Sequence, residues 1–518
     1  MSDLIPRSWA WATLADLLGK LQYGYTAKAS PDVEGARFLR ITDLDKGEVH
    51  WAQVPGCAIS SADLDRYRLH DGDIVFARTG SIEKTARVKR PPEAVFASYL
   101  IRGSPIDASL GPWLEAFSSS FLYVNQAKAA SGGIGRSNIN ARSLGRIRLP
   151  VPSHSEQERI VATLESYFTR LNDTALMLDR VQRSMTRYRA SVLKAAVEGR
   201  LVPTEAELAR VENRAYEPAS VLLGRILAER RRRWEAAELA RMEASGAVPT
   251  NDRWKARYCE PPEPSLARLP ELPEGWCWTT ADAVGDVLLG RQRAPQYLTG
   301  RNSHPYLRVA NIKDDVIDFS DVDRMDFGPE HFERYRLHPG DILVSEGQSP
   351  ELLGQSAIYR GGITDLCFQK TLHRFRPIEP GPSSELAQLV FRSHVKTGLF
   401  KRLGSITTNI AHLTLVKFRA SPFPLAPKQE QKRIVAEAER LLSIADQLET
   451  ILRQEIARGS RLRQAILKWA FEGKLVDQDP NDEPAPLLLE RIRAARRGAD
   501  SGTMTEPPRR RQIKRGRP

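Results

Sequence analysis

The sequence predicts a mixed α+β fold in which two sheet-containing domains are separated by two long helices that pack as an antiparallel coiled coil. Three observations support this prediction. The chain repeats itself, each repeat opens with short apolar runs between turn residues, and each repeat closes with a long apolar stripe at helical spacing. The 518 residues suffice for several domains, and the 41% hydrophobic content suffices to build their cores.

The repeat is an internal duplication of nearly the whole chain. RYRLHDGDI at 66–74 returns as RYRLHPGDI at 334–342, with eight identities in nine positions. VLKAAVEGRLV at 192–202 returns as ILKWAFEGKLV at 466–476, and other blocks recur in the same order. Chance does not preserve such an order, so the halves share one frame and we expect them to be related by a pseudo-two-fold axis.

The duplication divides the chain into six segments. Each copy is a domain followed by a long helix, with a connector between the copies and a shorter segment after the second. The predicted bounds are 1–152 and 273–427 for the domains, 153–202 and 428–476 for the helices, and 203–272 for the connector. Residues 477–518 are predicted to form a helical segment that repeats part of the connector, followed by a basic tail.

Strands are predicted where short apolar runs lie between turn residues. Such runs occur at 37–41 and 73–77 in copy one, and at 306–309 and 341–345 in copy two. We therefore expect a twisted sheet to dominate each domain.

The helices follow from apolar residues that recur every three or four positions, without an internal proline, over 155–200 and 429–473. One such stripe alone would face water, so we expect the two helices to pair. Gly199 and Gly473 are expected to end them. Prolines are expected to stop the strand before each helix, at positions 150, 152, 422, 424 and 427.

The connector holds a charged helical stretch at 225–246 and a proline-rich, extended stretch at 259–275. The helical stretch is typical of a solvated face, although it could also bind a partner. The tail from Gly498 to Pro518 is expected to lack structure and to make at most nonspecific phosphate contacts.

The net charge of +13 favours a polyanionic partner such as nucleic acid. The sequence has no run of 18 apolar residues and no secretory pattern at its start, so we expect a cytoplasmic protein with no membrane partner.

Sequence motifs for catalysis are missing. There is no phosphate-binding loop, no H-E-x-x-H and no G-x-S-x-G, and we expect no metal site. Asp341 followed by Glu346 is compatible with a metal-dependent nuclease, but no lysine accompanies them and copy one has Arg78 in place of the acid, so a nuclease site is not favoured. His70 and His338 recur at matched positions, where a packing role is favoured. Binding is therefore the predicted class of function.

The duplicated motifs resemble a known family. Each copy opens with P-x-x-W-x-W, contains R-Y-x-L-x-x-G-D-I, ends its domain with N-I-x-x-x-x-L, and continues with E-Q-x-R-I-V and L-K-x-A-x-E-G-x-L-V. This pattern, from residue 5 to about 497, resembles the DNA-specificity subunit of type I restriction–modification systems. The connector is longer than a minimal member of that family needs.

The resemblance implies a division of labour. Each domain would be a target-recognition domain for one half of an asymmetric, bipartite site in double-stranded DNA, and the helices would set the spacing between the halves. The implied partners are two DNA adenine methyltransferase subunits and restriction subunits with helicase and nuclease activity. The chain itself would be non-catalytic and would hold no cofactor, with S-adenosylmethionine, ATP and Mg²⁺ on the partner subunits.

The resemblance also implies where DNA is contacted: the loop after the G-D-I strand, the polar loop before N-I, and a further strand pair that differs between the copies. In copy one these residues are Arg78, Thr79, Gly80, Ser81, Lys84, Ser98, Tyr99, Arg136, Ser137 and Asn138. In copy two they are Glu346, Gln348, Ser349, Gln369, Lys370, Thr407, Thr408 and Asn409.

These candidates differ in what they predict. Arg78 and Glu346 change charge at one frame position, which favours a role in specificity, because arginine suits guanine and a carboxylate can accept from cytosine. Asn138 and Asn409 are shared, so capping of the next helical turn is the favoured role for both.

Two other functions stay open at the sequence level. One is a stand-alone DNA-binding or regulatory protein with no catalytic partner. The other is a coiled-coil scaffold whose domains bind proteins.

Overall fold

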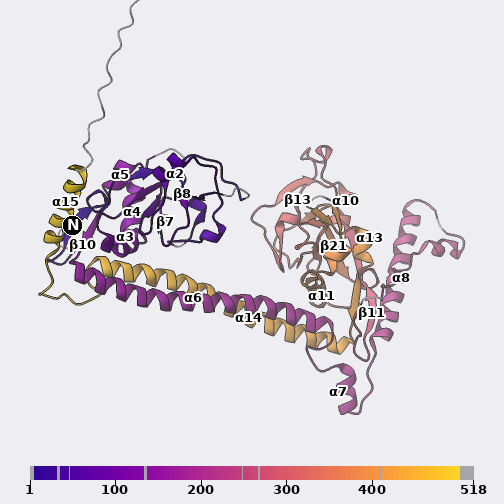
Figure 1. Ribbon diagram of the computed structural model, residues 1–518. Coiled ribbons are helices and arrows are strands. Elements are labelled where there is room, and N and C mark those ends of the chain that lie inside the picture. The colour runs from indigo at the N-terminus through magenta and orange to yellow at the C-terminus, as the bar shows by residue number, and fades with distance from the viewer. Residues whose placement is uncertain are drawn as a thin grey trace, which may run out of the picture. The chain divides into compact units, whose positions relative to one another are not determined.

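The computed structural model describes residues 5–31, 35–45, 47–132, 137–247, 249–266, 269–407 and 410–501. It divides into two compact units: unit 1 joins Met1–Asp179 to Arg453–Pro518, and unit 2 is the continuous stretch Arg180–Leu452. Figure 1 shows long helices beside mixed domains of strands and shorter helices. The predicted mixture of sheet with long helices is confirmed.

The domain of unit 1 alternates short strands with short helices. Its strands are β1 (Ala10–Thr13), β2 (Gln22–Tyr23), β3 (Arg37–Leu39), β4 (Leu44–Asp45), β5 (Glu48–Val49), β6 (Ile74–Ala77), β7 (Thr85–Arg87), β8 (Ala94–Phe96), β9 (Leu100–Gly103) and β10 (Arg148–Val151). Its helices are α1 (Leu14–Leu17), α2 (Ser61–Tyr67), α3 (Gly111–Ser118), α4 (Phe121–Ala130) and α5 (Ala141–Gly145).

The domain of unit 2 repeats this alternation after two connector helices. Its strands are β11 (Cys277–Thr280), β12 (Gly285–Leu289), β13 (Ser303–Leu307), β14 (Ile312–Lys313), β15 (Val316–Ile317), β16 (Asp323–Asp326), β17 (Ile342–Ser345), β18 (Gly347–Gln348), β19 (Ser356–Ile358), β20 (Cys367–Phe368), β21 (Leu372–Pro377), β22 (Ser405–Thr407), β23 (Ile410–His412) and β24 (Pro422–Leu425). Its helices are α7 (Glu205–Val211), α8 (Ala219–Ala244), α9 (Ala281–Val284), α10 (Pro329–Tyr335), α11 (Ser384–Lys396), α12 (Leu399–Leu403) and α13 (Leu415–Arg419).

The sheets of the two units have matching strand orders. A four-stranded antiparallel sheet runs β2-β9-β6-β7 in unit 1 and β12-β21-β17-β19 in unit 2. The parallel pair β3–β8 corresponds to β13–β20, and the antiparallel pair β1–β10 corresponds to β11–β24. The repeated sequence blocks therefore form the same strands of the same sheets.

The long helices are α6 (His154–Val197) and α14 (Lys428–Phe471), and each contributes residues to both units. Within unit 1, Arg463 of α14 donates to Asn172 of α6. Within unit 2, Arg189 of α6 pairs with Glu449 of α14 at 2.7 Å. The two segments that meet in each unit thus belong to different copies of the repeat. A last helix, α15 (Ala485–Ser501), packs against α1 and β1 within unit 1.

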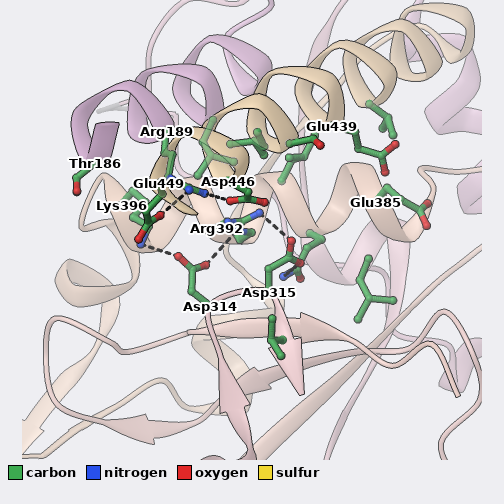
Figure 2. A pocket seen from close by; sticks show the side chains of 18 of the residues that line it. Thr186, Arg189, Asp314, Asp315, Glu385, Arg392, Lys396, Glu439, Asp446 and Glu449 are labelled. Atoms are coloured by element: carbon green, nitrogen blue, oxygen red, sulfur yellow. Dashed lines mark hydrogen bonds and ion pairs between the residues drawn. The ribbon is translucent and has the colours of Figure 1, made fainter. Parts of the chain in front are cut away.

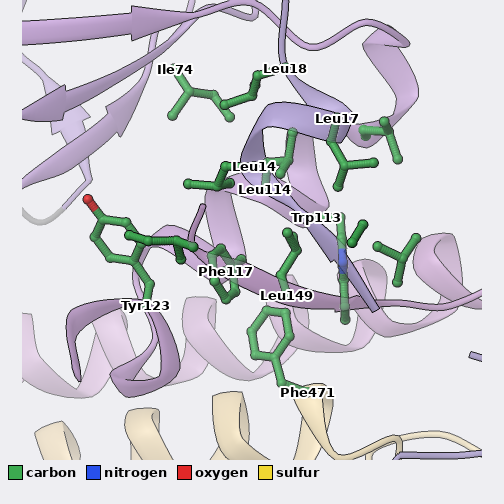
Figure 3. Packing of buried hydrophobic residues seen from close by; sticks show 14 of the residues in the cluster. Leu14, Leu17, Leu18, Ile74, Trp113, Leu114, Phe117, Tyr123, Leu149 and Phe471 are labelled. Carbon is green, nitrogen blue, oxygen red and sulfur yellow. The ribbon is translucent and has the colours of Figure 1, made fainter. Parts of the chain in front are cut away.

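The core of unit 1 shows why these segments belong together. Leu14 of α1, Trp113 and Phe117 of α3, and Leu149 of β10 form one buried cluster, shown in Figure 3. Phe471, the last residue of α14, joins this cluster, and its ring centre lies 4.5 Å from that of Trp113. The end of the second long helix therefore completes the core of the first domain.

The duplicated motifs meet at the start of each long helix. In unit 1, Trp9 of P-x-x-W donates to Glu156 of E-Q-x-R-I-V at 2.9 Å. In unit 2, Trp276 donates to Glu430 at the same distance. These contacts place the first strand of each domain against the helix that follows it, and they explain why both motifs recur together.

Gly199 and Gly473 end the long helices as predicted, with φ of +66° and +68°. Each glycine contacts the opening motif of the other copy: a Cβ on Gly473 would lie 2.4 Å from Pro6 Cγ, and one on Gly199 would lie 2.5 Å from Pro273 Cγ. The L-K-x-A-x-E-G motif of one copy therefore packs against the P-x-x-W motif of the other.

Two details of the strands and helices differ from the sequence-based expectations. Three of the five prolines do not stop the strand: Pro150 lies inside β10 opposite Trp11, and Pro422 and Pro424 lie inside β24, the latter opposite Trp278. Pro152 and Pro427 follow the ends of the two strands, as expected. Both strands belong to two-stranded sheets, where a missing N–H is tolerated. The helix after 483 extends to Ser501, past the expected end of order at Gly498.

The packing role expected for the matched histidines is wrong. His70 and His338 are exposed, and it is their backbone N–H that is used, donating to Asp73 at 2.9 Å and to Asp341 at 2.8 Å. The repeated aspartate of G-D-I thus orders its own turn.

Over the described residues, no helix combines the length and apolar character that crossing a membrane requires.

Candidate nucleic-acid interface

The first candidate residue of each domain follows an inner strand of the four-stranded sheet, β6 in unit 1 and β17 in unit 2. In unit 1, Arg78 comes directly after β6; its N–H donates to Tyr99 O, and its carbonyl accepts from Ile139 N, both at 2.9 Å. Its backbone is therefore held from both sides, by the turn before β9 and by the segment before α5. We call this residue the post-strand position.

Unit 2 holds Glu346 in the same way after β17. Its N–H donates to Thr371 O at 2.9 Å, and its carbonyl accepts from Leu413 N at 2.7 Å. The hydrogen bonds make Arg78 and Glu346 equivalent, and they also make Tyr99 equivalent to Thr371.

The two side chains at the post-strand position have different surroundings. The guanidinium carbon of Arg78 lies 4.6 Å from the ring centre of Tyr23, and Arg78 Nε is buried with no hydrogen-bond partner among the described residues. The carboxylate of Glu346 lies 3.3 Å from His412 Nδ1. One scaffold position thus presents a cation on an aromatic ring in one unit and a carboxylate beside an imidazole in the other.

In unit 1 the loop after β6 meets the predicted second loop. Thr79 forms a β-bridge with Asn138, and Gly80 N donates to Ser137 O at 2.9 Å. Gly80 has a φ of +72°, which favours glycine at this turn. Ser81, one residue further on, is partly exposed.

Lys84 lies apart from that junction. Its ammonium group donates to Ile41 O at 3.4 Å and to Leu44 O at 3.0 Å. This places the lysine charge in a neighbouring loop, where it orders the backbone.

In unit 2 the corresponding junction is a small sheet of three strands, β18-β23-β22. Gln348 of β18 pairs with Ala411 of β23, and Ser349 N donates to Gln348 Oε1 at 3.2 Å. Thr407 ends β22, opposite Ile410. The predicted residues Arg136, Thr408 and Asn409 lie outside the described part of the chain.

The third predicted pair of segments is corrected by the hydrogen bonds. Ser98, Tyr99 and Lys370 lie in turns before β9 and β21, not in strands. Leu100 N donates to Ala97 O, and Leu372 N donates to Gln369 O, so Gln369 corresponds to Ala97. The sequence-based pairing of Ser98 and Tyr99 with Gln369 and Lys370 was wrong by one residue.

The predicted capping role of Asn138 is also wrong. Asn140 caps α5, accepting from Ser143 N at 2.8 Å, and Thr414 caps α13. Because Ile139 and Leu413 make the same backbone hydrogen bond, Asn138 corresponds to His412 and not to Asn409. The shared N-I dipeptide therefore falls at different places in the two domains.

Sequence reasoning missed one segment of this interface. Tyr25 N donates to Phe96 O in unit 1, and Arg291 N donates to Phe368 O in unit 2. The preceding glycines allow the close approach, since a Cβ on Gly24 or Gly290 would lie 2.3 or 2.2 Å from a carbonyl oxygen. The signal was a matched glycine between unmatched neighbours, Y-G-Y against L-G-R.

Comparison with known proteins bears on this arrangement. Residues 34–176 match the family described as Type I restriction modification DNA specificity domain. The chain is 23% identical to the type I restriction enzyme EcoKI specificity subunit of Escherichia coli K12, over 82% of this chain and 81% of that protein. It is 22% identical to the EcoBI specificity subunit of Escherichia coli, over 94% and 92%.

Over most of its length, this chain is similar to type I specificity subunits.

The resemblance drawn from the duplicated motifs is thereby confirmed. These relatives are named as specificity subunits, as the sequence-based interpretation of the chain as a non-catalytic subunit expects. The fold is also similar to a solved chain titled "Structural basis underlying complex assembly and conformational transition of the type I R-M system". The TM-score is 0.61 at 17% identity, covering 91% of this chain and 99% of that one.

Asp341, the acidic residue compatible with a nuclease in the sequence, forms an ion pair in the structure. Asp341 is buried, and its carboxylate accepts from Arg376 Nε at 2.6 Å and from Arg376 Nη2 at 2.7 Å. Across the described residues, no group of three or more histidine, cysteine, aspartate or glutamate side chains is placed to hold a metal ion.

A charged cavity of about 560 Å³ lies elsewhere in unit 2, and Figure 2 shows its lining. Its charges are paired with one another: Arg392 holds Asp314 and Asp315 at 3.0 and 2.9 Å. Burial acts to raise the pKa of Asp314, but Arg392 and Lys396 outweigh it and lower that pKa. Ion pairs between lining residues therefore account for the charge at its centre, and we do not include the cavity in the nucleic-acid interface.

Proposed function

We propose that this chain is the sequence-reading subunit of a type I restriction–modification complex in the cytoplasm. Each domain reads one half of an asymmetric bipartite site in double-stranded DNA. The observation that supports this proposal is the post-strand position, where an identical backbone arrangement carries Arg78 in one unit and Glu346 in the other. One scaffold with opposite charges at one position is suited to two different base sequences.

The proposed contacts surround the post-strand position in each unit. In unit 1 they are Arg78, Thr79, Gly80, Ser81, Ser98, Tyr99, Arg136, Ser137 and Asn138, with Lys84 supporting the loop. In unit 2 they are Glu346, Gln348, Ser349, Gln369, Lys370, Thr407, Thr408 and Asn409.

The long helices are proposed to pack as an antiparallel coiled coil that relates the two halves by a pseudo-two-fold axis and fixes the gap between the half-sites. The proposed partners are two DNA adenine methyltransferase subunits and the restriction subunits. S-adenosylmethionine, ATP and Mg²⁺ then belong to those partners, and the chain supplies position without chemistry of its own.

The test is methylome sequencing of the host with and without an intact copy of this chain. We expect methylation to disappear from one asymmetric, gapped motif and to return when the intact chain is restored. Unchanged methylation in a host with an active methyltransferase partner would contradict the proposal. Purified chain that still bound duplex DNA would then point to a stand-alone binder.

A further inference from the structure

The connector contains a folded extension that the proposed function leaves unused. We call residues 225–247 and 249–258 the connector arm; it consists of most of α8 and a returning 3-10 turn, Asp252–Arg257. Trp234 of α8 stacks on Trp254 of the turn with ring centres 5.9 Å apart, and Tyr258 lies 5.3 Å from Trp234. Because three aromatic rings join its two limbs, the arm is an ordered element.

The arm presents an excess of positive charge. Three glutamates of α8 each hold two basic side chains. The sets are Glu229 with Arg232 and Arg233, Glu235 with Arg231 and Lys255, and Glu238 with Arg241 and Arg257. The sets of Glu229 and Glu238 each carry one positive charge more than they neutralise, whereas Lys255 of the Glu235 set also pairs with Asp252 at 3.1 Å.

The geometry directs that charge outward. Glu238 is 11% exposed, whereas the guanidinium groups that it holds, Arg241 and Arg257, are 70% and 53% exposed. The carboxylate of Glu238 contacts the Nη2 group of each arginine. The other N–H groups of both guanidinium groups therefore face solvent in a fixed orientation. Arginines fixed in this way lose less conformational entropy when they bind, and their planar forks match phosphate oxygens.

The root of the arm is joined to the interface of unit 2. Asp282 is buried between Arg230 of α8, at 2.8 Å, and Arg419 of α13, at 2.9 Å. Helix α13 begins directly after β23, the strand that pairs with Gln348. Two ion pairs therefore connect the arm to the segment that carries the proposed base contacts.

We propose that the connector arm binds the phosphate backbone of double-stranded DNA beside the half-site that unit 2 reads. This inference rests on the proposed function. The contact is independent of base sequence and adds affinity by neutralising phosphates.

The first experiment compares two matched double variants of the full chain. The arm variant is Arg232→Gln with Arg241→Gln, and the control is Arg440→Gln with Arg458→Gln on α14. All four arginines are highly exposed and pair with a glutamate three residues earlier. We expect the arm variant alone to reduce the log–log salt slope of DNA binding by about 1–2, since each phosphate contact contributes about 0.9.

The second experiment locates the contact. Duplexes carry the gapped site and are extended by about one helical turn, roughly 10 bp, beyond one half-site or the other. Wild-type chain is expected to gain affinity only from the extension beside the half-site of unit 2, which Glu346→Ala identifies. The arm variant is expected to gain from neither extension.

Equal salt slopes for the arm and control variants would overturn the inference, as would a flank effect that survives in the arm variant. Normal DNA binding with loss of the co-purifying methyltransferase would also overturn it, because the arm would then contact protein. Failure of the proposed function looks different: wild-type chain would bind the gapped site no better than a scrambled duplex.

Discussion

Arg78 and Glu346 show how much one residue can decide in this fold. Their backbones make the same two hydrogen bonds, so only the side chain distinguishes the two domains at this position. The charge difference was predictable, because the G-D-I strand aligns without gaps. The neighbours Tyr23 and His412 were not predictable, since they come from segments that have no sequence match between the copies.

At this scale we predict that specificity separates by domain. Arg78→Ala is expected to relax base preference in one half-site, and Glu346→Ala in the other, each by roughly 1–3 kcal/mol of discrimination. The measurement is binding to duplexes with single-base changes in each half. Lys84→Ala is the contrasting variant: it is expected to lower the stability of unit 1 without changing base preference. Relaxation of both halves by one variant would contradict the prediction.

Two buried histidines make unit 2 sensitive to acid. Burial lowers the pKa of His373 and of His394 to about 4, and each Nε2 contacts a backbone carbonyl oxygen, Leu413 O at 2.7 Å and Pro422 O at 2.8 Å. Below pH 6.5 the unfolded chain binds protons that the folded chain does not, so folding stability is lost as the pH falls from about 6.5 towards 4. Ile101 occupies the position of His373 in unit 1.

We therefore predict that His373→Ile reduces the loss of stability between pH 6.5 and 4. The measurement is urea unfolding across this pH range, followed by hydrogen exchange in peptides of unit 2. The control is His70→Gln, which removes an exposed histidine of unit 1 and leaves the buried histidines of unit 2 in place. The same pH dependence in wild type and His373→Ile would contradict the prediction.

At the scale of elements, the helices were predictable and their contacts were not. Period and absence of proline placed α6 and α14 to within a few residues of their ends. Periodicity reports only on neighbouring residues in the sequence. The contacts of Gly473 with Pro6 and of Gly199 with Pro273 each join two copies of the repeat, so periodicity does not predict them. The mismatched N-I motif has a related cause: loops of unequal length separate it from the matched strands, and Ile139 corresponds to Leu413 instead of Ile410.

The helix end in unit 1 gives a further prediction. Gly473→Ala adds a Cβ at positive φ that also collides with Pro6, whereas Gly246→Ala adds one at positive φ in open space. Left-handed backbone alone costs about 1–2 kcal/mol, so Gly246→Ala measures that cost and Gly473→Ala is expected to exceed it. Thermal unfolding compares the two. Equal destabilisation would show that the contact with Pro6 contributes nothing.

At the scale of the whole molecule, the mixture of sheets with long helices could be predicted because the duplication repeats every level of organisation. Strand order, helix ends and opening motifs recur together, and each copy supported the interpretation of the other. What the sequence could not show is that each unit is assembled from both copies. That exchange depends on which helix segments pair, and an apolar stripe does not specify its partner.

The proposed spacer predicts a change in site architecture. Inserting four residues into both α6 and α14, where the units divide, adds about 6 Å at 1.5 Å per residue. At 3.4 Å per base pair, the gap is expected to grow by about two base pairs while both half-sites stay the same. Methylome sequencing gives the length of the gap and the sequences of both half-sites. An insertion in one helix alone is the control and is expected to disturb pairing of the helices; an unchanged gap after the double insertion would count against the spacer.

Because the end of α14 completes the core of the first domain, the order in which the protein folds during synthesis is affected. Unit 2 is one continuous stretch, so all of it has left the ribosome once Leu452 has emerged. The core of unit 1 needs Phe471, Leu488 and Ile492, which are made later. The first domain to be translated is therefore the last to be completed, the reverse of the usual N-terminal-first order. In the interval, the surface that Phe471 will cover is open to other apolar chains, and nascent molecules are then at greatest risk of association.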